Sequence, residues 1–122
     1  MEEHDVRERA EALCAALVAG DITRVTEDFS QELRQNLGEV LALLLLPSNE
    51  ATVESIDRGG GSGYAVLLRL VGAAEEVLIQ TRWKDRDGRA TLVEASHLSR
   101  TETAAQDVEE QDATSGAGEE PT

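Results

Sequence analysis

The apolar residues of this chain change their spacing near Glu50, and this change limits the fold more than any other feature of the sequence. Before Glu50 they recur at the spacing of an amphipathic helix, and after it they alternate with polar residues as in a strand. Helices followed by strands indicate an α+β fold with an antiparallel sheet rather than a parallel α/β sheet. At 122 residues, the chain has room for one such domain.

Three helices are predicted before the change. The first carries an apolar stripe over residues 6–17 and ends at Gly20, which suits the left-handed position after a helix. Asp21 and Ser30 have side chains that can cap a short second helix and a third one. The third helix is leucine-rich and is expected to stop before Pro47, because proline disfavours the helical conformation of the residue before it.

Four strands are predicted after the change. They cover residues 52–58, 64–71, 76–84 and 89–98. A turn at residues 73–74 gives the second and third strands a shared apolar face, with the pairs Val66–Thr81, Leu68–Ile79 and Leu70–Val77. This face should hold the helices. In the first strand, Val53 and Ile56 share a face only if a bulge intervenes.

The opposite face of the sheet is half-apolar and carries arginine. Its central residues are Leu67, Arg69, Leu78, Gln80 and Arg82. A surface of this mixed kind suits a protein–protein contact, so a homodimer through the outer sheet face is one expectation. A solvated sheet face is the alternative.

The last part of the chain has a different composition. Residues 101–122 contain seven acidic residues and no Lys or Arg, so half of the net charge of −14 belongs to them. Such a stretch cannot bury enough apolar surface to offset the entropy lost on ordering. The sequence therefore predicts a folded domain over residues 1–100 and a disordered acidic tail over residues 101–122.

Composition also excludes several classes of function. The net charge and an aromatic content of 2% argue against nucleic acid and anionic membranes as partners. The longest apolar run covers the seven residues 40–46, far fewer than the roughly 20 of a membrane-spanning helix. The first residues do not resemble a signal peptide, so a cytoplasmic protein is expected. With two histidines and a single cysteine, Cys14, which the helical pattern buries, no metal site and no cofactor are expected.

Two stretches resemble the nuclear transport factor 2-like superfamily, which includes ketosteroid isomerases and SnoaL-type cyclases. They are ALVAGDI at residues 16–22 and TRWKDRDGR at residues 81–89. The resemblance implies a curved sheet wrapped around helices into a cone with an inner pocket, often dimeric through the sheet. Members usually have a short strand or hairpin after the second helix. Here the chain is expected to run directly into its third helix, so that Leu43 to Leu46 reduce or fill the pocket, and no catalytic motif is matched.

The candidate acid–base residues depend on the hairpin at residues 85–88. A two- or four-residue loop places Leu92, Glu94, Ser96 and Leu98 on the face of Trp83. A three-residue loop with a bulge at Gly88 places Thr91, Val93, Ala95 and His97 there instead. In the first case burial near Thr81 would raise the pKa of Glu94 toward that of a general base. In the second, His97 would approach the helices. A half-exposed polar residue is the alternative in both.

Two functions follow from these observations. Tyr64 and Trp83 should pair at the open end of the apolar face and, with Thr81, line the mouth of a pocket for a small apolar ligand, although simple packing is the alternative. The first function is a non-enzymatic module that dimerises and binds such a ligand or a protein partner. The second is a cofactor-free isomerase, dehydratase or cyclase that uses Glu94 or His97. An accessory protein whose acidic tail contacts a basic partner is a third, weaker possibility.

Overall fold

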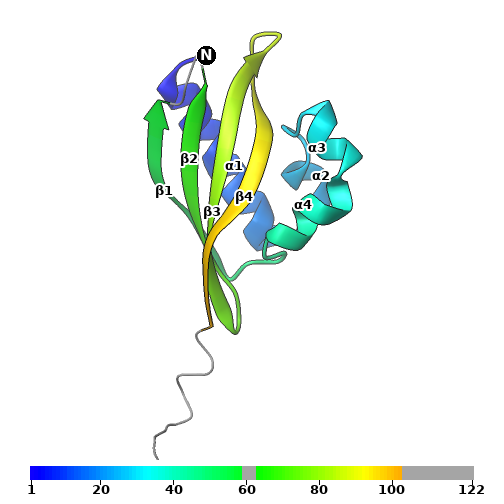
Figure 1. Ribbon diagram of the computed structural model, residues 1–122, viewed down its shortest axis with the longest axis vertical. Helices are drawn as coiled ribbons and strands as arrows, with labels where there is room; N and C mark the ends of the chain where they lie inside the picture. Colours follow the sequence, from blue (N-terminus) through cyan, green and yellow to red (C-terminus); the bar gives the residue numbers. More distant parts are fainter. Residues whose placement is uncertain (59–62, 103–122) are drawn as a thin grey trace, which may run out of the picture.

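The computed structural model describes residues 1–58 and 63–102 and shows an α+β fold with an open four-stranded antiparallel sheet (Figure 1). The helices are α1 (Glu3–Ala19), α2 (Ile22–Val25), α3 (Gln31–Gln35) and α4 (Leu37–Leu43). The strands are β1 (Glu50–Arg58), β2 (Tyr64–Val71), β3 (Glu75–Arg86) and β4 (Arg89–Glu102), and they lie in the sheet in sequence order. α1 lies against one face of the sheet, and α2, α3 and α4 lie together beside β4 (Figure 1). The predicted α+β class is confirmed.

The predicted helix ends are confirmed at three residues. Gly20 ends α1 in the left-handed conformation, with φ 72°, which costs glycine little. The Asp21 side chain accepts a hydrogen bond from the Arg24 backbone N–H at 3.2 Å. The Ser30 hydroxyl accepts one from the Leu33 N–H, also at 3.2 Å. The Asp21 and Ser30 side chains each satisfy a backbone N–H that has no partner within its own helix.

The prediction of one continuous third helix is wrong. The chain leaves the helical conformation at Asn36, with φ −116° and ψ 36°, and α4 begins directly after it. The Asn36 side chain donates to the Glu32 carbonyl at 3.3 Å, the kind of local hydrogen bond that competes with helix continuation. Gly38 adds a second residue of low helix propensity. α4 ends at Leu43, four residues before Pro47.

The register of the central strands is confirmed. Val66 lies opposite Thr81, Leu68 opposite Ile79, Leu70 opposite Val77 and Tyr64 opposite Trp83. β1 contains the bulge that its pattern requires, between Val53 and Ser55. As a result, Val53 pairs with Leu68 and Ile56 with Val66, so both β1 residues lie on the helix-bearing face.

Three strands are longer than predicted. β1 begins at Glu50, β3 runs from Glu75 to Arg86, and β4 continues beyond Leu98 to Glu102. The first two residues of the predicted tail, Thr101 and Glu102, pair with Glu76 and Glu75. The remainder of that tail, residues 103–122, and residues 59–62 between the first two strands lie outside the described residues.

The core lies between α1 and the sheet and is mainly aliphatic. Its fully buried side chains include Val6, Leu17, Val66, Leu68, Leu70, Ile79, Trp83 and Leu92. Cys14 is buried beside them, as predicted, and burial, aided by the charge of Glu11, raises the pKa of its thiol to about 12. This thiol is a structural apolar group, not a nucleophile. Of the helices in the described residues, none has the length and apolar character that crossing a membrane requires.

Candidate functional site

Glu94 lies on the outer face of the sheet, away from the helices. The hairpin has the two-residue turn Asp87–Gly88 with both φ angles positive, so Trp83 pairs with Leu92 as the first register alternative requires. The ladder then shifts by one residue, and Glu94 pairs with Arg82. Its carboxylate lies 3.6 Å from the Arg82 guanidinium and is largely exposed.

The shift leaves Val93 as an extra residue in β4 and has a clear physical reason. Without it, Glu94 would lie opposite Thr81, which is fully buried. Burying a carboxylate without a cation is costly, whereas the shift places Ala95 opposite Thr81 instead. The structure thus follows the first alternative up to Leu92 and the second one from Ala95 to His97, after which a second shift leaves Leu98 as an extra residue.

His97 approaches the helices, as the second alternative requires. It lies opposite Ile79, and its Nε2 is 3.0 Å from the Leu43 carbonyl oxygen at the end of α4. The imidazole is nevertheless exposed, and it lies apart from Glu94 on the other face of the sheet. The structure does not bring the two acid–base candidates together.

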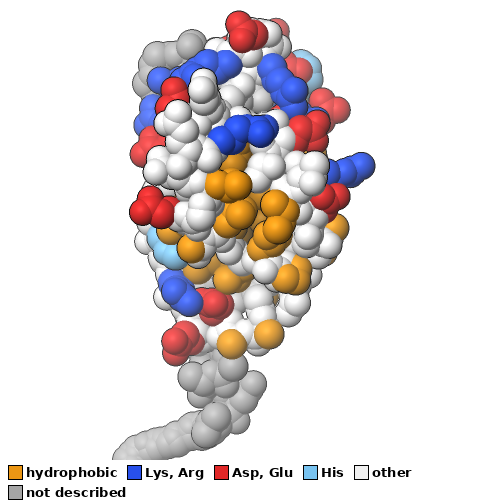
Figure 2. Space-filling model, turned by 90° about the vertical axis from the view of Figure 1, so that its right-hand side faces the viewer, with side chains coloured by type: hydrophobic (Ala, Val, Ile, Leu, Met, Phe, Trp, Pro, Cys, Tyr) orange, Lys and Arg blue, Asp and Glu red, His pale blue; other side chains and the backbone are white. Residues whose placement is uncertain are grey.

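At the end of α4, Leu44 belongs to the apolar core, and Leu45 and Leu46 pack against it. Leu44 is buried, and Leu43, Leu45 and Leu46 are half-buried. Apolar side chains gather in the middle of the face that carries α2, α3 and α4 (Figure 2).

The three predicted ligand-binding residues have different surroundings. Thr81 is fully buried, and its hydroxyl donates to the Val66 carbonyl at 2.8 Å and accepts from the Trp83 indole N–H at 2.9 Å. Its polar capacity is therefore used within the core. Tyr64 is buried and its ring lies 5.2 Å from the Arg58 guanidinium. Of the three, Trp83 alone borders the cavity described next.

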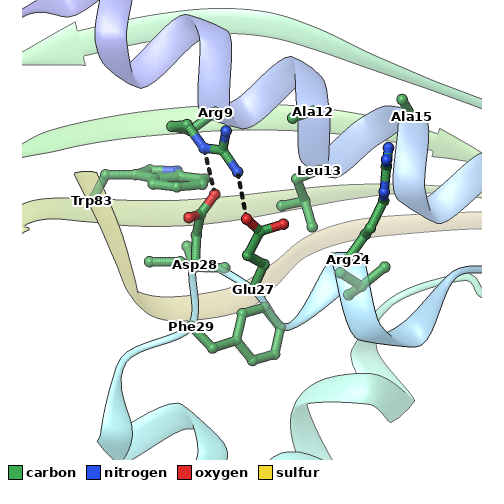
Figure 3. A pocket seen from close by; sticks show the side chains of 11 residues that line it. Arg9, Ala12, Leu13, Ala15, Arg24, Glu27, Asp28, Phe29 and Trp83 are labelled. Atoms are coloured by element: carbon green, nitrogen blue, oxygen red, sulfur yellow. Dashed lines mark hydrogen bonds and ion pairs between the residues drawn. The ribbon is translucent and has the colours of Figure 1, made fainter. Parts of the chain in front are cut away.

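A cavity of about 300 Å³ opens between α1, the chain from α2 to Phe29, and the hairpin end of β3 and β4 (Figure 3). We call it the arginine cavity. It is lined by Arg9, Ala12, Leu13, Ala15, Arg24, Val25, Glu27, Asp28, Phe29, Trp83 and Leu92. The apolar side chains that line it, Val25, Phe29, Trp83 and Leu92, are all buried, at most 5% exposed, and form its floor. Small alanines on α1 leave the space open.

Asp28 is the most buried charged group at this cavity and is held by two arginines. It is 8% exposed. Its Oδ2 accepts from Arg9 Nε at 2.7 Å, and its Oδ1 accepts from Arg89 Nη2 at 2.6 Å and Nε at 3.1 Å. The hydrogen bond and charge of Asp28, with a smaller effect of Glu27, raise the pKa of the Arg89 guanidinium. Both oxygens of this carboxylate are thus engaged.

The segment that carries Asp28 is fixed by backbone hydrogen bonds to β4. Leu92 donates to the Asp28 carbonyl at 2.7 Å, and Ser30 donates to the Leu92 carbonyl at 2.8 Å. These two bonds make Phe29 a single-residue parallel bridge to Leu92. The Arg34 guanidinium also donates to the carbonyls of Thr26 at 2.7 Å and Phe29 at 3.2 Å. The loop between α2 and α3 is therefore held at both of its ends.

Sequence reasoning missed the arginine cavity. Arg9 and Asp28 are 19 residues apart, and Asp28 and Arg89 are 61 residues apart. No local spacing pairs them. One usable signal was the sequence Glu-Asp-Phe-Ser at residues 27–30, since an Asp among residues that must be buried needs a cation nearby.

The predicted interface residues share the outer face, and its arginines are already paired there. Leu67, Leu78 and Gln80 are half-buried. Arg69 donates to both oxygens of Glu76, at 3.0 and 3.1 Å, and this contact raises the pKa of Arg69. With Arg82 paired to Glu94, the face has an apolar centre and locally neutralised charges.

The described residues contain no group of three His, Cys, Asp or Glu side chains placed to hold a metal ion. The chain matches no protein-family model and none of the curated proteins with which it was compared. The geometry of the arginine cavity and of the outer sheet face is therefore the basis for assigning a function.

Proposed function

We propose that the chain is a small nuclear transport factor 2-like module that binds a ligand in the arginine cavity without catalysis and dimerises through its outer sheet face. The order of helices and strands supports the family. So does the extended segment around Phe29, which bridges to Leu92 directly after α2. This is where members of the family usually have a short strand or hairpin, a feature that the sequence pattern alone did not indicate.

One observation carries the binding role: the cavity has an apolar floor, and its buried carboxylate is fully engaged by arginine. Ligand pockets are usually apolar clefts of about 300–1,000 Å³ with a few placed polar groups, and this cavity lies at the small end of that range. Asp28 accepts three hydrogen bonds from two guanidinium groups, and this stabilises its charged form and lowers its strength as a general base.

Ligand-observed NMR with a pool of small fragments tests this role. We expect saturation transfer to a subset of fragments with the wild-type chain. That transfer should be lost in Ala12→Trp, because the new side chain fills the cavity from the exposed side of α1. The same substitution at Ala19, at the exposed C-terminal end of α1, is the control. Equal transfer in all three proteins would contradict the proposal.

Analytical ultracentrifugation tests the dimer. The half-buried Leu67 and Leu78 lie diagonally across β2 and β3 on the outer face, where they could pack against a second copy. We expect a dimer at micromolar concentration and a monomer for Leu78→Lys. A wild-type chain that sediments only as a monomer would rule out this part of the proposal.

A cofactor-free enzyme remains the second candidate, and Asp28 is the observation in its favour. It is a buried carboxylate that lines a cavity, as an isomerase or dehydratase of this kind requires. Its test is exchange of deuterium from solvent into a pool of small ketones and aldehydes, followed by NMR. Exchange that is catalysed by the wild type and lost in Asp28→Asn would favour the enzyme over the binding module.

A further inference from the structure

We infer that the arginine cavity takes a small organic monocarboxylate, with its carboxylate on Arg24 and Arg9 and its apolar body against Trp83 and Phe29. This inference rests on the proposed binding role and adds the chemical class of the ligand. It rests on the arginine N–H donors at the cavity that do not donate to neighbouring side chains.

These unused donors belong to the guanidinium groups of Arg24 and Arg9. Among the described residues, the Arg24 side chain donates no hydrogen bond, and its nearest carboxylate is Asp21, at 3.8 Å. This side chain is 75% exposed at the cavity mouth, where it stands beside Ala15 (Figure 3). Arg9 uses its Nε for Asp28, but its Nη2 lies 3.8 Å from Glu27, beyond hydrogen-bond length. Two guanidinium groups therefore have N–H donors available to a ligand.

The acceptors are better satisfied than the donors. Asp28 accepts three hydrogen bonds, and Glu27 has arginine nitrogens at 3.5 Å from Arg89 and at 3.8 Å from Arg9. A cationic ligand would have to displace one of these arginines. An anion instead adds to donors that are already present, and the planar fork of arginine fits a carboxylate in a bidentate manner.

The charge around the cavity agrees with this choice. Arg9, Arg24 and Arg89 balance Asp21, Glu27 and Asp28, and the Arg34 guanidinium adds one positive charge whose hydrogen bonds go to backbone carbonyls. In a chain with a net charge of −14, this is a locally neutral to positive region. It favours a monoanion over a multiply charged phosphate, for which two partly engaged arginines are few.

The apolar floor of the cavity suits the apolar body of the ligand. Phe29 is 5% exposed, and it lines the cavity together with Leu92, the alanines of α1 and the fully buried Trp83, so this wall is apolar. Aromatic rings stack or meet edge to face on such surfaces. At about 300 Å³ the cavity admits a ligand of one ring or a short aliphatic chain, so an arylalkanoic acid fits both ends.

Isothermal titration calorimetry with 3-phenylpropionate and its neutral amide tests the inference. We expect the acid to bind at least about tenfold more tightly than the amide, the factor for one charge-assisted hydrogen bond. Arg24→Gln should remove that preference while leaving the fold intact, because Arg24 is exposed. Arg7→Gln, an exposed arginine on α1 that pairs with Glu11 outside the cavity lining, should bind the acid like the wild type.

The contrary outcomes are distinct from failure of the binding role. Equal affinity for acid and amide, lost in Ala12→Trp, would overturn the inference and leave the cavity as a site for neutral ligands. Tighter binding of the acid that persists in Arg24→Gln would overturn the assignment of Arg24. Tighter binding of inorganic phosphate than of the acid would also contradict a monocarboxylate ligand. Transfer to no fragment in the NMR screen would instead remove the binding role itself.

Discussion

The centre of the sheet and its β4 margin are held together by different forces. At the centre, the inner faces of β2 and β3 pair Leu68 with Ile79 and bury both completely against the core. At the margin, the loop between α2 and α3 is held to β4 by Phe29, which is buried, but also by Asp28 between two arginines. The hydrophobic effect gives the centre stability without direction, whereas the margin depends on a few placed charges and leaves a cavity beside them.

The largest expected effect lies at the centre. Leu68→Ala should lower the free energy of unfolding by about 3 kcal/mol, because it removes buried methyl groups and leaves a cavity in a closed layer. Urea unfolding followed by circular dichroism measures it. Leu98→Ala is the matched control, since Leu98 is 58% exposed on β4 and its loss should be below about 1 kcal/mol. Equal losses would mean that the centre is not the more closely packed region.

A smaller effect is expected at the margin. Asp28→Asn keeps the shape of the side chain but removes the charge that holds Arg9, so the free energy of unfolding should fall by about 2 kcal/mol. Glu27→Gln is the control, because Glu27 is half-exposed and makes longer contacts to the same arginines. Because Asp28 is 8% exposed, salt should screen its contacts little, and the loss in Asp28→Asn should persist in high salt. An equal loss in Glu27→Gln would show that the buried carboxylate is not the group that holds this margin.

The same contrast explains what the sequence could predict. Alternation along β2 and β3 determines which side chains face the helices, because a shift by one residue would expose all of them. The register from Tyr64–Trp83 to Leu70–Val77 is confirmed for this reason. The bulge in β1 was also predictable, since Val53 and Ile56 have to reach one face.

The β4 register and the cavity were less predictable, for a physical reason. The hairpin residues favour a two-residue turn, while the apolar pattern further along β4 favours the other register. The first register alone would bury Glu94, and the second alone would place Leu92 on the outer face. Only the shift at Val93 satisfies both, and its position depends on Thr81 on the neighbouring strand. The contacts of Asp28 are likewise set by tertiary structure, so no spacing in the sequence encodes them.

Cys14 provides a pH-dependent test of how closely the α1 core is packed. Burial raises the pKa of its thiol from 9.0 to about 12, so between these values the unfolded chain loses a proton that the folded chain keeps. Stability from this group is therefore complete below pH 9 and is lost as the pH rises toward 12. The stability of the wild type relative to Cys14→Ala should fall by about 1 kcal/mol between pH 8 and pH 10. A constant difference in urea unfolding would show that the thiol is open to solvent.

The smallest effect is expected for the ion pair on the outer face, and it sharpens the comparison between exposed and buried charges. Arg82 and Glu94 are 3.6 Å apart and 42% and 63% exposed, whereas Arg9 and Asp28 are 2.7 Å apart and 32% and 8% exposed. A double-mutant cycle with Arg82→Gln and Glu94→Gln should give a coupling energy below about 1 kcal/mol, because exposed pairs gain little beyond solvation and side-chain entropy. The cycle at Arg9 and Asp28 should give a larger value, since burial of the carboxylate removes competing water. A stronger coupling at the outer pair would reverse this order and would place the important charges of this fold on its proposed dimer face rather than at its cavity.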